Sequence, residues 1–73
     1  MSEIQLKVGK FYVVRDELEA INSNAESIIK IVDYDNKTGY YLGEDGIFYR
    51  PDGGINYANG LEDPFDLVKE VTN

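Results

Sequence analysis

The chain has 73 residues, of which 14 are acidic and 7 basic, giving a formal net charge of −7, and it contains neither cysteine nor histidine. This length predicts one small domain spanning residues 1–73, with a thin stability margin because a chain of this size buries only about 60% of its unfolded surface. The composition excludes disulfides, removes the commonest zinc ligand and general base, and disfavours direct binding to a nucleic-acid backbone, which requires lysine and arginine.

The N-terminal residues carry no targeting signal that we recognise. Residues 1–10 lack the apolar run of a secretory signal, and no segment approaches the ~18 apolar residues of a membrane span. We therefore expect a cytoplasmic protein without membrane association and without a cofactor. Because dimerisation can supplement a small core, both a monomer and a small homo-oligomer stay open.

The first predicted elements are a strand and a short helix. Residues 4–8 alternate apolar and polar side chains, and residues 11–14 (Phe-Tyr-Val-Val) have the composition of a strand. Asp16 occupies a helix-capping position, and Glu19 follows it at the capping-box spacing. The pattern therefore predicts a strand that ends at a capped helix.

The helix and the next strand are expected to pack together. A helix of one or two turns is unstable alone, so we expect it to lie on the sheet through Leu18 and Ile21 and to end near residues 22–24. Residues 27–32 (Ser-Ile-Ile-Lys-Ile-Val) are apolar at both alternating sets of positions. This pattern predicts a central strand that is covered on both faces, as in a barrel or beneath a helix.

The middle of the chain, Ser27–Tyr57, predicts an antiparallel meander. Three clusters rich in Asp, Asn and Gly, at residues 35–39, 43–46 and 51–54, have the chemistry of hairpin turns. The segments between them are rich in β-branched and aromatic residues, as strands are. These segments are Ile28–Tyr34, Tyr40–Leu42, Ile47–Arg50 and Ile55–Tyr57.

The C-terminal part predicts a turn, a 3₁₀ segment and a closing strand. Residues 58–60 (Ala-Asn-Gly) form the turn, and Phe65 within residues 61–66 is expected to close one end of a barrel. Residues 67–71 carry a lysine and a glutamate, which suit an edge strand. The predicted fold is mainly β: a small SH3-like barrel, or a strongly bent antiparallel sheet, of five to six short strands with one short helix.

No segment carries the pattern of a metal site or an active site. The segment Asp33–Glu44 superficially resembles a calcium loop, but Lys37 and Thr38 occupy the positions where an EF-hand has a ligand and a glycine. A hairpin turn is the better interpretation, so we expect no metal. The other carboxylates lie mostly in predicted turns, and without histidine we expect no enzyme activity.

The aromatic residues of the meander are the candidate binding residues. Neighbours in a strand face opposite ways, so one member of each aromatic pair points outward. Tyrosine and arginine are common interface anchors. The candidate partner-binding residues are Tyr40, Tyr41, Phe48, Tyr49, Arg50 and Tyr57, and the candidate acidic surface is Asp33, Asp35, Glu44, Asp45, Glu62 and Asp63. The alternative, which the limit on burial favours, is that the aromatics fill the core and rim of a barrel too small to hide them all.

Three segments of this chain resemble those of small phage and prophage-encoded proteins. These proteins combine an early Val-Gly-Lys-x-Tyr strand, a Tyr-x-x-Asp-Gly hairpin and an acidic-Pro-x-Asp-Leu-Val ending. The matching segments here are Val8–Tyr12, Phe48–Gly54 and Asp63–Val71. The resemblance implies a phage-borne accessory protein in the host cytoplasm, whose targets are host enzymes, defence components or nucleic-acid machinery. It implies no activity and no functional residue.

Three functional hypotheses follow. The first is a non-catalytic binding module, which binds or inhibits a host macromolecule, with a host protein as the expected partner, through exposed aromatics flanked by acidic turns. The second is an acidic nucleic-acid mimic that blocks a nucleic-acid-binding protein. The third is a small-ligand protein that sequesters a nucleotide, although its basic residues are scattered along the chain.

Overall fold

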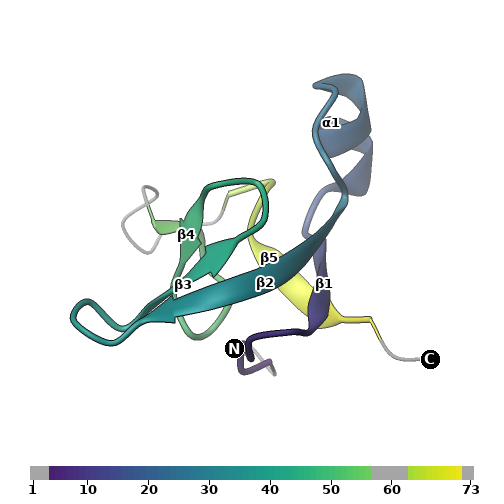
Figure 1. The fold of residues 1–73 in the computed structure, drawn as a ribbon. Helices are drawn as coiled ribbons and strands as arrows, with labels where there is room; N and C mark the ends of the chain where they lie inside the picture. The colour runs from purple at the N-terminus through teal and green to yellow at the C-terminus, as the bar shows by residue number, and fades with distance from the viewer. Residues whose placement is uncertain (1–3, 57–62, 72–73) are drawn as a thin grey trace.

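A computed structural model describes residues 4–56 and 63–71 of the chain. In chain order the elements are β1 (Phe11–Val14), α1 (Glu17–Asn22), β2 (Ile28–Asp35), β3 (Tyr40–Gly43), β4 (Phe48–Tyr49) and β5 (Leu67–Glu70). The five strands form one antiparallel sheet in the order β4-β3-β2-β1-β5. The sheet is strongly curled into a half-barrel, with the helix beside it (Figure 1). The predicted fold class is confirmed.

Two irregularities bend the sheet. The pairing of β2 with β3 shifts register between Ile31 and Asp33, and the pairing of β1 with β5 shifts between Val13 and Val14. An extra residue in one strand of a pair increases the local twist and bends that strand. The long strand β2 therefore joins two differently inclined parts of the sheet.

The segment between β4 and β5 links the two ends of the curled sheet. Ile55 forms a single antiparallel bridge with Tyr49 of β4. On the other side, the N–H of Leu67 donates to the Gly53 carbonyl at 2.7 Å, and the N–H of Leu6 donates to the Pro51 carbonyl at 3.0 Å. Of the predicted strand Ile55–Tyr57, the described part is thus a bridge rather than a strand, while Tyr57 and the predicted turn at residues 58–60 lie outside the described residues.

The core lies on the inner side of the curl. Its fully buried apolar residues are Leu6, Tyr12, Val14, Ala20, Ile29, Ile31, Tyr49, Ile55 and Leu67. The Tyr12 ring is buried, while its hydroxyl accepts the N–H of Lys7 at 2.9 Å and lies 3.4 Å from the Gln5 carbonyl. Because an unpaired hydroxyl is costly to bury, these contacts permit a tyrosine at this position. Residues 4–8, which alternate in sequence, form no strand but contribute Leu6 to the core.

The helix does not pack as the sequence predicted. Leu18 is 68% exposed and Ile21 is 61% exposed, whereas Ala20 is fully buried. The helix stands clear of the sheet at the end of β1 (Figure 1), so only its Ala20 side meets the core. The predicted cap is confirmed, since the Asp16 carboxylate accepts the N–H of Glu19 at 3.0 Å.

The prediction that β2 is covered on both faces is also wrong. Ile29 and Ile31 are buried, but Ile28 and Val32 on the outer face are more than 40% exposed. The reason is the position of α1, which lies beside the sheet instead of over its outer face. The prediction that the C-terminal strand is an edge is confirmed, because β5 ends the strand order.

Candidate functional site

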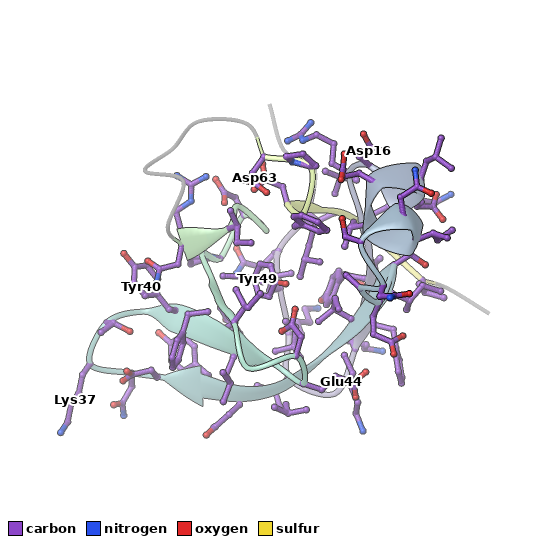
Figure 2. All side chains as sticks on the ribbon, turned by 90° about the horizontal axis from the view of Figure 1, so that it is seen from above. Asp16, Lys37, Tyr40, Glu44, Tyr49 and Asp63 are labelled. Atoms are coloured by element: carbon purple, nitrogen blue, oxygen red, sulfur yellow. The ribbon has the colours of Figure 1, made fainter. Side chains whose placement is uncertain are left out.

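The predicted aromatic residues do not form one surface. Tyr41 pairs directly with Tyr49 on the inner side of the sheet, whereas Leu42 pairs with Phe48 on the outer side. Tyr49 is only 1% exposed, so it belongs to the core and is not a surface anchor. Tyr41 packs partly against the core and contacts Tyr34 in a tilted arrangement, with ring centroids 4.7 Å apart. Figure 2 shows Tyr49 in the centre of the molecule.

The remaining aromatic candidates are dispersed. Phe48 is 37% exposed on the outer face, and Tyr40 lies half-buried near the far end of the β2–β3 hairpin, beside Lys37 (Figure 2). The guanidinium of Arg50 lies against Gly54, where any side chain would collide with it, and its Nε is 3.6 Å from the Asp52 carboxylate. Tyr57 lies outside the described residues.

The aspartates have structural roles in turns and caps, as the turn clusters and the Asp16 capping position predicted. Each of the seven aspartates of the chain accepts at least one hydrogen bond from a backbone N–H, and for five of the seven residues this bond closes a local turn or helix cap. These aspartates are Asp16, Asp33, Asp35, Asp45, Asp52, Asp63 and Asp66. Much of the acidic charge therefore accompanies turn formation.

The candidate acidic surface is likewise not a single array. Asp33 and Asp35 lie on β2, Asp45 lies in the β3–β4 turn, and Asp63 precedes β5. Glu44 and Asp63 lie on opposite sides of the molecule in Figure 2. Glu62 lies outside the described residues.

The structure instead brings together a pocket that the sequence analysis did not identify. It has a volume of about 340 Å³ and opens beside the loop that joins α1 to β2. Its floor consists of the buried side chains of Val14, Ile29 and Tyr49, from β1, β2 and β4. The half-buried side chains of Ile47 and Phe65 flank this floor. The result is an apolar concavity at one end of the half-barrel.

The β3–β4 turn forms one wall of the pocket and is fixed by Asp45. One carboxylate oxygen of Asp45 accepts the N–H of Ile47 at 3.1 Å, and the other accepts the Tyr49 hydroxyl at 2.7 Å. Gly43 permits this packing, because a Cβ at that position would lie 2.6 Å from the Asp45 carboxylate and 2.9 Å from Ile29. The carboxylate is thus held in one orientation at the edge of the pocket.

The loop after α1 also lines the pocket. The helix ends in a Schellman motif, in which the N–H of Ala25 donates to the Ala20 carbonyl at 2.8 Å and the N–H of Asn24 donates to the Ile21 carbonyl at 3.1 Å. Asn24 has a φ of 59°, the left-handed conformation that this motif requires. The motif turns the chain so that Asn24, Ala25 and Glu26 line the pocket.

The turn that positions Phe65 depends on Asp66, the buried charged residue of the described chain. Asp66 is 3% exposed. Its carboxylate accepts the N–H of Ile55 at 2.7 Å and the N–H of Asp63 at 3.0 Å, and it pairs with the Arg15 guanidinium at 3.2 Å. The sequence pattern places most carboxylates in predicted turns, but it does not predict that Asp66 is buried. Its spacing from Asp63 indicates a turn, but its burial depends on Ile55, which lies eleven residues earlier.

The charged residues that line the pocket are all acidic. Among the described residues that line it, Glu26 and Asp45 are acidic and none is basic. The described residues contain no group of three or more acidic side chains that could hold a metal ion, and no helix among them has the length and apolar character to cross a membrane. The arrangement is suited to holding an apolar group next to negative charge.

No family model, curated protein or solved structure that was compared with the chain matches it.

Proposed function

We propose that the chain is a non-catalytic protein-binding module, whose pocket receives a side chain from a partner protein. The observation that carries the proposal is the apolar concavity of about 340 Å³, with the Glu26 and Asp45 carboxylates among its lining. This volume is at the lower end of the range for binding pockets, so it suits a side chain or a small fragment better than a large ligand. The resemblance to phage-encoded proteins makes a host protein the expected partner.

The pocket supports this function better than the two alternatives. A nucleotide-sequestering site requires cations for the phosphates, and the described lining residues include none. A nucleic-acid mimic requires carboxylates arranged along one face, whereas the aspartates follow turns on different sides of the domain. A concave apolar site that receives an anchor residue is a common feature of protein recognition.

The test uses a random peptide display library selected on the immobilised protein. The variant Ile47→Arg inserts a long charged side chain at the pocket, and Ile28→Arg makes the same change on the exposed outer face. Both variants are first checked for a dispersed amide spectrum, so that loss of folding is not mistaken for loss of binding. We expect peptides that bind the wild-type protein and Ile28→Arg but not Ile47→Arg. Peptides that no longer bind Ile28→Arg but still bind Ile47→Arg would contradict the proposal.

A further inference from the structure

We infer that the pocket recognises a basic side chain, a lysine or an arginine, which inserts its alkyl stem over the apolar floor and places its charged head at Asp45 and Glu26. The inference rests on the proposed function and names the chemistry of the anchor. Long basic side chains combine an apolar stem with a charged end, and they bind where apolar and anionic surfaces meet. The pocket offers both surfaces within one concavity.

The Asp45 carboxylate is prepared for a cation. Its two oxygens provide about four acceptor sites, and the N–H of Ile47 and the Tyr49 hydroxyl occupy two of them. These bonds fix the orientation of the group before a ligand arrives, which lowers the entropic cost of binding. Asp45 is an exposed residue, so the acceptor sites that these two bonds leave are accessible to solvent.

The nearest basic residues in the sequence interact elsewhere. Lys30 lies on β2, and its ammonium is 5.8 Å from the centroid of the Phe11 ring on the outer face. Arg15 pairs with Asp66, and Arg50 lies near Asp52. Among the described residues, none of the ion pairs found involves Glu26 or Asp45. Their negative charge is therefore directed to solvent and to a ligand.

The aromatic lining adds to the selectivity. Phe65 and Tyr49 both line the pocket, and a cation is attracted to the face of an aromatic ring. The net charge of −7 further raises the local concentration of a cationic segment. An uncharged apolar side chain would gain binding free energy only from its contact with the apolar floor.

The experiment compares two small probes that share an n-butyl stem and differ in the head group, which is a charged guanidinium or a neutral hydroxyl. The ¹⁵N-labelled protein is titrated with n-butylguanidinium chloride and, separately, with n-butanol in sodium chloride of matched ionic strength. We expect n-butylguanidinium to shift the amides of Glu26, Asp45 and Ile47 in a saturable manner, with at least about three-fold tighter binding than n-butanol, as expected for a partly exposed charge pair. Equal binding of the two probes would leave an apolar pocket without basic selectivity and would overturn the inference. Shifts spread over the other acidic turns, or no shift at the pocket, would overturn it as well.

A charge-matched pair of variants locates the effect. Glu26→Gln and Glu17→Gln each remove one negative charge, but only Glu26 lines the pocket, while Glu17 lies exposed on α1. We expect Glu26→Gln to weaken n-butylguanidinium binding about two- to five-fold and Glu17→Gln to change it little. Equal weakening of n-butylguanidinium binding by the two variants would mean that the binding depends on the net charge of the protein and not on the pocket. If the display selection yields peptides that depend on Ile47 but lack lysine and arginine, this inference fails and the proposed function stands; if no peptide depends on Ile47, the proposed function fails.

Discussion

The Asp45 carboxylate accepts the Tyr49 hydroxyl at 2.7 Å, and this contact joins the β3–β4 turn to the core. Tyr49 is buried, so its hydroxyl requires a partner, and Asp45 provides it from the surface turn four residues earlier. The same carboxylate accepts the N–H of Ile47 and lines the pocket. The Asp45 side chain thus stabilises a turn, accepts the hydrogen bond of the buried Tyr49 hydroxyl and places a negative charge at the candidate site.

Replacing Tyr49 by phenylalanine tests this relationship. We expect Tyr49→Phe to lower the free energy of unfolding by about 1 kcal/mol, because one hydrogen bond is lost while the ring volume is kept. The matched control is Tyr34→Phe, at a tyrosine that is 44% exposed, for which a change below about 0.5 kcal/mol is expected. Urea denaturation monitored by circular dichroism measures both, and equal effects would show that the Asp45 contact contributes nothing.

Removing the Asp66 carboxylate should be far more harmful than removing an exposed aspartate. Asp66→Ala leaves the N–H of Ile55 without its acceptor in a buried position, and it removes the acceptor of the Asp63 N–H. We expect a loss of about 2–4 kcal/mol, which is a large share of the stability of so small a domain. Asp33→Ala, at an exposed residue, serves as the control and should cost less than about 1 kcal/mol.

If Asp66→Ala does not fold, Asp66→Asn provides the second measurement. Its amide oxygen retains one acceptor for the N–H of Ile55, while the charge that pairs with Arg15 is lost. We therefore expect a folded protein of intermediate stability in urea denaturation. The Arg15 pair and the hydrogen bond from the Asp63 N–H share one carboxylate oxygen, so stability of Asp66→Asn equal to that of the wild-type protein would mean that neither interaction contributes.

The stability of the domain should fall at alkaline pH through Tyr12. Burial raises the pKa of Tyr12 above its ordinary value of 10.0, and the hydrogen bond from the Lys7 N–H opposes this only in part. Because the pKa is higher in the folded state than in the unfolded state, the Tyr12 contribution is complete below pH 10.0 and is lost as the pH rises above it. Tyr12→Phe should be less stable near neutral pH, by about 1 kcal/mol, and should depend less steeply on pH.

The measurement for Tyr12 is urea denaturation of both proteins at intervals from about pH 8 to about pH 11, the range around the tyrosine pKa. Tyr40→Phe is the control, because its ring is only half-buried. Parallel pH profiles for the wild-type protein and Tyr12→Phe would contradict the assignment.

The two large apolar residues of α1, Leu18 and Ile21, should tolerate truncation, although the sequence predicted that they pack on the sheet. Ile21→Ala removes a side chain that is 61% exposed, so we expect a change within about 0.5 kcal/mol. Ile29→Ala truncates a buried residue of the same type and should cost about 2–5 kcal/mol. Thermal unfolding of the two variants distinguishes them, and a large loss for Ile21→Ala would mean that the helix packs on the sheet after all.

Local signals in the sequence predicted much of the fold. The turn clusters rich in Asp and Gly correctly separate β2, β3 and β4, and Asp16 correctly begins the helix. Lysine and glutamate in the last strand correctly indicated an edge. These features depend on residues that are close together in the chain, which is why composition and spacing were sufficient.

The features that failed depend on distant contacts. The exposure of Leu18 and Ile21 follows from where the helix stands relative to the sheet, and no local pattern contains that information. The burial of Asp66 follows from its contact with Ile55, and the pocket combines β1, β2, β4 and the turn before β5. The aromatic alternation correctly assigned opposite faces to Phe48 and Tyr49, but it did not indicate which of the two faces the core.

The most direct test of the binding site is a crystal structure of the protein with the tightest display-selected peptide. We expect a lysine or arginine side chain of the peptide to lie in the pocket, with its stem over the apolar floor and its charged end at Asp45. A peptide bound instead to the outer face of the sheet, over Phe11 and Ile28, with the pocket unoccupied, would contradict the account.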